Sequence, residues 1–113
     1  MKVAVIGSRK LNINNLSPYI PFSATTIISG GAIGIDKCAE RYAKDNGLEL
    51  KVFPPDYASF GKQAPIFRNL EIIAAADLVV AIWDGESKGT KFVIDRCLRE
   101  GKPVKVYEVR GSK

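Results

Sequence analysis

Histidine is absent from the 113-residue sequence, and cysteine occurs only twice, at Cys38 and Cys97. Without histidine the chain lacks the most common general base and metal ligand of proteins, which excludes Ser-His-Asp and Cys-His catalytic arrangements. No group of cysteines, aspartates or glutamates has the spacing of a zinc or calcium site, so neither a metal nor another cofactor is expected. Both cysteines fall on apolar stripes of expected helices, which predicts buried and reduced thiols.

Long hydrophobic runs are missing as well. No apolar run approaches the roughly 18 residues that a membrane span requires, and the apolar stretch at residues 2–6 is too short for a signal peptide. We therefore expect a cytoplasmic protein without a membrane partner. Basic residues exceed acidic ones by 17 to 12, for a formal net charge of +5, which favours anionic partners such as nucleotides, phosphates or nucleic acid. The basic residues are scattered, which counts against a long nucleic-acid groove.

Apolar runs and helical patterns alternate along the rest of the chain. Strands are expected at 2–6, 25–29, 49–53, 78–83 and 103–109, and helices at 34–46, 64–76 and 89–100, with a weak helix at 14–20, a loop at 56–61 and a frayed tail at 110–113. Nearly continuous apolar strands are typical of parallel strands covered on both faces. We predict a single α/β domain over residues 1–113, built on a doubly wound, Rossmann-like parallel sheet of about five strands in the order 3-2-1-4-5.

The apolar positions of the three main helices predict which face of each helix packs on the sheet. The inward residues of the first helix are expected to be Ile35, Cys38, Ala39, Tyr42 and Ala43. Those of the second are expected to be Ile66, Phe67, Leu70, Ile73 and Ala74, and those of the third Val93, Ile94, Cys97 and Leu98.

Three glycine-bearing turns each follow an apolar strand, at residues 7–10, 29–36 and 83–90. Glycine allows sharp turns and leaves backbone N–H groups uncovered, and a helix N-terminus attracts anions. In the predicted strand order these turns meet outside the carboxyl ends of the strands, where the chain reverses direction and ligands bind in such sheets. Neither Gly-x-Gly-x-x-Gly nor a Walker A pattern is present, which argues against ordinary dinucleotide dehydrogenases and P-loop NTPases.

Residues in and near these turns form the predicted ligand site. For each residue a purely structural role, such as turn geometry, helix capping or a solvated charge, is the alternative. Asp84 ends a strand at the switch point, where an acid has little structural reason to lie. Arg68 is either a surface residue or a phosphate ligand, and Tyr57 and Phe60 either stack on a base or cover the edge of the core. The full predicted ligand set is Gly7, Ser8, Arg9, Ser29, Gly30, Gly31, Gly34, Asp36, Asp56, Tyr57, Arg68, Asn69, Asp84, Gly89 and Thr90.

Several short motifs, taken in order, resemble those of the SLOG superfamily of nucleotide-ligand-binding proteins, and within it the small YspA-like branch. They are Val5-Ile6-Gly7-Ser8-Arg9, Ser29-Gly30-Gly31-Ala32-Ile33-Gly34-Ile35-Asp36, Phe53-Pro54-Pro55-Asp56-Tyr57 with Phe60-Gly61, Pro65-Ile66-Phe67-Arg68-Asn69, and Gly89-Thr90. The second motif also resembles the glycine-rich segment of DNA-processing protein A, a single-stranded DNA binder. The resemblance implies a site for a nucleotide-derived small molecule, such as an ADP-ribose-, NAD- or cyclic-nucleotide-like species, and a homodimer or higher homo-oligomer.

The same superfamily includes the LOG-type phosphoribohydrolases, which carry Pro-Gly-Gly-x-Gly-Thr-x-x-Glu. Here the position of their catalytic glutamate holds Val93, so an enzyme of this kind would have to use Asp84 or Glu86 as its carboxylate. Three hypotheses follow. The first is a binding module that senses, carries or sequesters its ligand, the second is a nucleotide N-glycosidase, and the third is a single-stranded DNA binder.

Overall fold

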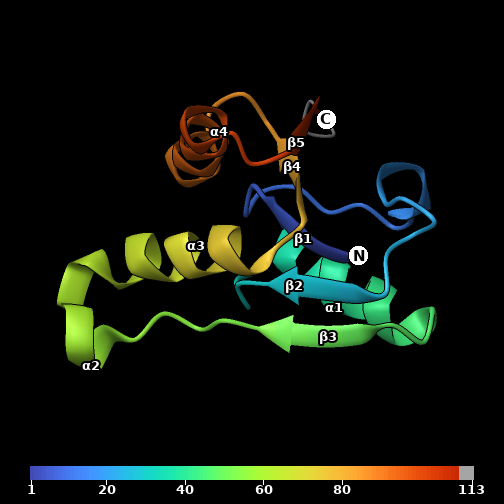
Figure 1. Cartoon of the computed structure of the whole chain (residues 1–113), viewed down its shortest axis with the longest axis horizontal. Helices are drawn as coiled ribbons and strands as arrows, with labels where there is room; N and C mark the ends of the chain where they lie inside the picture. Colours follow the sequence, from blue (N-terminus) through green and yellow to red (C-terminus); the bar gives the residue numbers. More distant parts are fainter. Residues whose placement is uncertain (110–113) are drawn as a thin grey trace.

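A computed structural model describes residues 1–109 and contains one five-stranded, all-parallel sheet (Figure 1). The strands lie side by side in the order β3-β2-β1-β4-β5. Their bounds are Lys2–Gly7 for β1, Thr26–Ser29 for β2, Glu49–Val52 for β3, Leu78–Trp83 for β4 and Val104–Glu108 for β5. The predicted fold class and strand order are confirmed, and the arrangement is that of a Rossmann-like fold.

Helices cover both faces of the sheet because its central strands are apolar on both sides. Helix α1 (Ile35–Asp45) packs on one face, over Val3, Val5 and Ile27. Helices α3 (Ala64–Ala75) and α4 (Lys88–Glu100) pack on the other, over strand residues that include Ala4 and Val79. Alternate residues of the three central strands β2, β1 and β4 therefore belong to two separate cores, and the sheet is the middle layer of three.

Two of the smaller sequence predictions were wrong. The loop expected at 56–61 contains a short helix, α2 (Tyr57–Phe60), which continues into the 3-10 turn η2 (Gly61–Gln63). Asp56 caps α2, because its carboxylate accepts a hydrogen bond from the Ser59 N–H at 3.1 Å. The weak helix expected at 14–20 is only the 3-10 turn η1 (Ser17–Tyr19). The tail at 110–113 lies outside the described residues.

The predicted inward faces of the helices are confirmed in part. On α1, Ile35, Cys38, Ala39 and Ala43 are buried, and on α4, Val93, Ile94 and Cys97 are buried, whereas Leu98 is 67% exposed. The prediction for α3 was largely wrong: Ile73 is buried, but Ile66 and Phe67 are exposed, and the buried face also contains Ala64, Arg68 and Ile72.

The course of α3 explains this difference. Its N-terminal turns, together with α2, project past the carboxyl ends of β2 and β3 (Figure 1). Over that length no strand lies beneath the helix, so apolar periodicity alone cannot decide which side faces inward. The C-terminal part returns to the sheet, where Ile72 and Ile73 are each 1% exposed.

Cys38 and Cys97 are buried and free, as predicted, and belong to the cores on opposite faces of the sheet. Within residues 1–109, none of the helices has the length and apolar character needed to cross a bilayer.

Candidate functional site

A cavity of about 440 Å³ opens at the carboxyl ends of β1 and β4, where the strand order reverses. We call it the switch-point cavity. Its walls come from the turn after β1, the turns before α1 and α4, and the inward side of α3. The lining residues are Ile6, Gly7, Arg9, Lys10, Ala32, Asp36, Pro65, Arg68, Asn69, Ile72, Asp84, Glu86, Ser87, Gly89, Thr90 and Val93.

About half of the predicted ligand residues line this cavity: Gly7, Arg9, Asp36, Arg68, Asn69, Asp84, Gly89 and Thr90. Arg9 and Lys10 are exposed at the start of the turn after β1, and neither forms an ion pair with another described residue. Together with Arg68 they place three cations around a space that also contains the carboxyl groups of Asp36, Asp84 and Glu86.

Arg68 is the most deeply placed of these cations, with an exposed fraction of 8%. Its Nη1 donates to the Gly30 carbonyl at 2.6 Å, and its Nε donates to Asn69 Oδ1 at 2.8 Å. Within residues 1–109 these bonds leave the second terminal nitrogen, Nη2, without an acceptor, while the side chain lines the cavity. Burial lowers the pKa of Arg68, against the attraction of nearby Asp36. Two hydrogen bonds to the protein therefore fix the guanidinium, and among the described residues the N–H groups of Nη2 remain free to donate to a ligand.

Asp36 lies beside Arg68, since a Cβ on Gly30 would be 2.9 Å from Asp36 Oδ2 and 2.6 Å from Arg68 Nη1, and Asp36 is 6% exposed. Its Oδ2 accepts a hydrogen bond from the Ala32 N–H at 3.1 Å. Burial raises the pKa of this carboxyl to about 6, even though the Ala32 N–H and Arg68 favour the charged form. The sequence prediction weighed a ribose ligand against a helix cap. The carboxylate accepts a bond from the turn before α1, which is a structural role, and it also lines the cavity.

The turn before α4 is built by Asp84. Its Oδ1 accepts hydrogen bonds from the backbone N–H groups of Glu86 and Ser87, both at 2.8 Å. These bonds lower the pKa of Asp84. The expectation that an acid at this position has little structural reason to be there was therefore wrong, because the carboxylate shapes the turn. Ser87 then caps α4 by accepting the Thr90 N–H.

Two predicted hydroxyl ligands serve the scaffold instead. Ser8 is 1% exposed, and its Oγ accepts the Asp84 N–H at 3.1 Å, which ties the turn after β1 to the turn after β4. Ser29 is fully buried, and its single hydroxyl hydrogen has two acceptors within reach, Glu40 Oε2 at 3.2 Å and the Asp36 carbonyl at 3.3 Å. Its Oγ also accepts the Gly31 N–H. Neither hydroxyl lines the cavity.

The predicted glycines fall into two groups. A Cβ on Gly7 would lie 2.4 Å from the Ile82 carbonyl oxygen, and one on Gly34, where φ is +78°, would lie 2.5 Å from that of Arg9. A Cβ on Gly30 would lie 2.6 Å from Arg68 Nη1. These glycines permit close packing behind the cavity wall. Gly89 differs, because a Cβ there would meet nothing within 4 Å.

The remaining predicted residues do not line the cavity. Gly30, Gly31 and Gly34 are in the supporting turn, and Asp56 and Tyr57 are on the projecting α2. The Phe60 ring stacks on the Phe67 ring of the same chain, with centroids 4.3 Å apart. The prediction that Tyr57 or Phe60 stacks on a bound base therefore has no support from their position.

Sequence reasoning missed several lining residues. Lys10 follows Arg9 in the predicted turn at residues 7–10, so its place in the sequence could have identified it as a lining residue. Pro65 and Ala32 also line the cavity, and neither has a side chain whose chemistry would have pointed to a site.

No protein-family model matches the chain, and neither a curated protein nor a solved structure is significantly similar to it. The resemblance to the SLOG superfamily thus rests on the short motifs quoted above, and any function has to be argued from the switch-point cavity itself.

Proposed function

We propose that the chain binds a nucleotide-derived small molecule in the switch-point cavity and acts as a sensor, carrier or sequestering protein. One observation carries the proposal: the cavity at the strand-order reversal combines unpaired cations, an accessible helix N-terminus and a buried carboxyl. Its volume of about 440 Å³ is within the roughly 300–1,000 Å³ typical of small-molecule sites.

The anionic part of the ligand would bind at the mouth of the cavity. Arg9 and Lys10 supply positive charge there without an internal ion pair. Gly89 leaves the first turn of α4 uncovered, so a phosphate can approach the backbone N–H groups and the positive end of the helix dipole.

The polar, uncharged part of the ligand would reach the deeper wall. Asp36 supplies an acceptor and Arg68 Nη2 supplies a donor, side by side. Hydroxyl groups of a sugar or the edge of a base can satisfy such a pair. A ligand with phosphate at one end and these groups at the other fits the nucleotide class.

A nucleotide N-glycosidase is the second candidate, because two carboxylates line the same cavity. Asp84 is already engaged with two backbone N–H groups, whereas Glu86 is exposed on the turn. Stabilisation of an oxocarbenium-like transition state by this chain would therefore depend mainly on Glu86.

The first test is a thermal-shift and calorimetry screen against ADP-ribose, NAD, AMP and cyclic nucleotides, with mass spectrometry of each mixture afterwards. Ligand that binds only the folded state raises the melting temperature. The double variant Arg9→Ala/Lys10→Ala is expected to lose most of the shift. Arg41→Ala/Lys44→Ala, which removes two exposed cations from α1, is the matched control and should retain it.

The screen separates the candidates. Intact ligand with a raised melting temperature supports binding, whereas release of a free base that stops in Glu86→Gln supports the N-glycosidase. Absence of a shift with every nucleotide would contradict both. Binding of a single-stranded oligonucleotide that weakens steeply with salt would then favour the DNA-binding hypothesis.

A further inference from the structure

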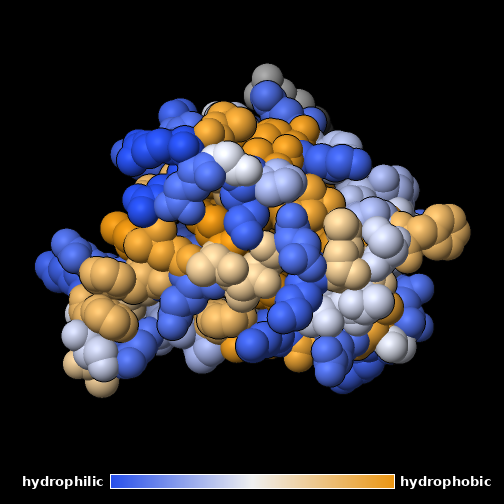
Figure 2. All heavy atoms as spheres, viewed as in Figure 1, coloured by the Kyte–Doolittle hydropathy of each residue, from blue (hydrophilic) through white to orange (hydrophobic). Residues whose placement is uncertain are grey.

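The outward side of α3 exposes apolar side chains that the sequence pattern places in a core. Ile66 is 44% exposed and Phe67 39%. On α2, Phe60 is 44% exposed and stacks on Phe67, and Tyr57 is 58% exposed. We call Phe60, Ile66 and Phe67 the aromatic patch, and Tyr57, which interacts with Arg68 on the inner side of α3, is not counted in it. Figure 2 shows apolar atoms over the projecting α2 and α3, at the left of the molecule.

The patch keeps about two-fifths of its surface exposed, because α2 and the first turns of α3 extend beyond the sheet (Figure 1). The inner side of α3 lines the switch-point cavity with Arg68 and Pro65. The helix cannot rotate to bury Phe67 without losing the bond from Arg68 to the Gly30 carbonyl. Contiguous exposed apolar groups of this kind mark protein interaction surfaces.

Charges beside the patch indicate which partner fits. Lys62, in η2 just before α3, and Glu71, in the middle of α3, are both exposed and flank the patch along the helix. When two copies of α3 pack antiparallel around a two-fold axis between residues 66 and 67, Lys62 of each copy lies opposite Glu71 of the other. A two-fold interface requires such a self-complementary surface.

We infer that the aromatic patch is the interface of a homodimer in which two α3 helices pack antiparallel. Phe67 and Ile66 of one copy then contact Ile66 and Phe67 of the other, and the Phe60 ring extends the apolar centre. The two Lys62–Glu71 pairs lie at the rim and set the register. Because this surface lies on the outer side of α3, the inference does not depend on what the switch-point cavity binds.

Sedimentation equilibrium over about 1–300 µM, the range in which interfaces at the small end of the size scale associate, tests the dimer. The chain is expected to reach twice its 12.3 kDa mass. Phe67→Glu is expected to remain a monomer throughout.

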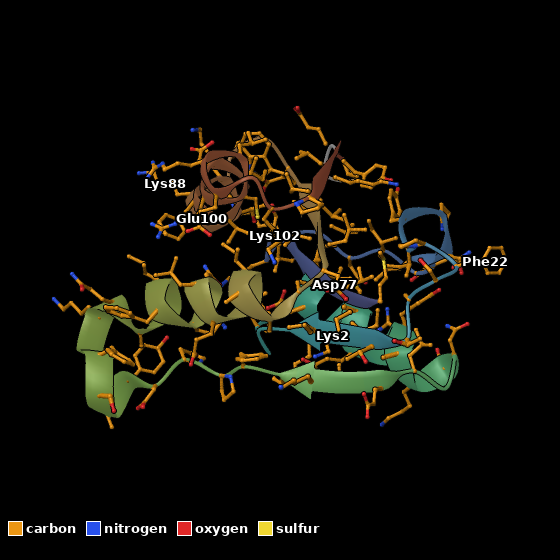
Figure 3. The ribbon with its side chains drawn as sticks, viewed as in Figure 1. Lys2, Phe22, Asp77, Lys88, Glu100 and Lys102 are labelled. Carbon is orange, nitrogen blue, oxygen red and sulfur yellow. The ribbon has the colours of Figure 1, made fainter. Side chains whose placement is uncertain are left out.

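Phe22→Glu is the matched control. Phe22 is fully exposed and points into solvent at the opposite end of the molecule from α3 (Figure 3). It lies beside a hollow that includes Ile20, Tyr42 and Leu48. The Phe22→Glu variant therefore also tests whether copies of the chain associate through that hollow instead of through α3. A monomer at all concentrations, or a dimer that is lost in Phe22→Glu and kept in Phe67→Glu, would overturn the inference.

Charge reversal tests the register. Lys62→Glu and Glu71→Lys, each alone, place like charges together at both rim contacts and are expected to weaken the dimer several-fold at low salt. The double variant restores both pairs and should return the dissociation constant close to that of the unaltered chain. If the loss of dimer affinity in the double variant equals the sum of the losses in the two single variants, antiparallel pairing in this register is excluded.

Discussion

The turn before α1 and the turn before α4 look alike in sequence, since each follows an apolar strand and contains glycines and an acid. Their glycines act differently in the structure. In the first turn Gly34 is required, because φ is +78° and a Cβ would strike the Arg9 carbonyl. The second turn also has a glycine at positive φ, Gly85 at +84°, whereas Gly89, in the first turn of α4, faces open space. Gly34 therefore permits close packing behind the cavity, whereas Gly89 leaves the first turn of α4 accessible from the cavity.

The two acids differ in a similar way. Asp36 is buried and has a pKa raised to about 6, whereas Asp84 is bound by two backbone N–H groups and has a lowered pKa. A carboxyl is thus costly to ionise in the first turn and easily ionised in the second. The environment, not the residue type, sets the chemistry of each carboxyl.

The largest expected effect comes from forcing a side chain into the closed turn. Gly34→Ala introduces both a positive-φ penalty and a clash with two backbone carbonyls, and we expect a loss of more than about 3 kcal/mol of unfolding free energy. Urea denaturation followed by circular dichroism measures it. A loss below about 1 kcal/mol would show that the turn is not closely packed and would remove the contrast with Gly89.

The next effect concerns the pH dependence of stability. The unfolded Asp36 carboxyl loses its proton near 3.8, while the folded one keeps it until about pH 6. Between these values the folded state binds more protons, so the Asp36 contribution to stability falls as the pH rises from about 4 to 6 and is level above that. The free energy of unfolding is expected to fall by about 2–3 kcal/mol over this pH range through Asp36 alone.

Asp36→Asn keeps an acceptor for the Ala32 N–H but has no titrating carboxyl. Unfolding free energies measured from pH 4 to 7 in both proteins isolate the effect, because the other carboxyls titrate in both. As the pH rises, the unfolding free energy of Asp36→Asn should increase relative to that of the unaltered protein. A constant difference would mean that Asp36 titrates normally.

A smaller effect is expected in the second turn. Asp84→Ala removes the acceptor for the Glu86 and Ser87 N–H groups, which water can replace on this partly exposed turn. We expect a loss of about 1 kcal/mol. Asp84→Asn retains an acceptor oxygen and is expected to lose less, so equal losses would point to the charge instead of the hydrogen bonds.

The smallest effect on stability is expected from Gly89→Ala. Alanine is a better helix former than glycine and meets no neighbour here, so stability should rise by about 0.5 kcal/mol in a thermal melt. The methyl group would cover the first turn of α4, and affinity for a nucleotide found in the screen should fall. Unchanged affinity would place the phosphate elsewhere in the cavity.

Most of the fold could be predicted from the sequence. The strands were found within one or two residues because long apolar runs can be satisfied only by burial on both faces of a sheet. The strand order followed from short right-handed connections. Helix α2 was missed because four residues between Pro54-Pro55 and Gly61 carry too little periodicity to identify a helix.

The site was predicted less completely. Its location followed from topology, and Arg9, Asp36, Arg68 and Gly89 do line the cavity. The contact of Ser8 with the scaffold could not be foreseen, because its partner Asp84 lies on another turn of the chain.

Sequence by itself determined the layered parallel sheet and the edge at which a cavity forms, because both depend on hydrophobic pattern and connection length, which are local properties. Tertiary structure decided the rest. Arg68 faces inward and Phe67 outward because the Gly30 carbonyl is available on one side of α3, while the helix has no strand beneath its first turns. The pKa of Asp36 is raised because the folded chain buries its carboxyl, whereas that of Asp84 is lowered by the N–H groups of Glu86 and Ser87, which lie two and three residues further along the chain.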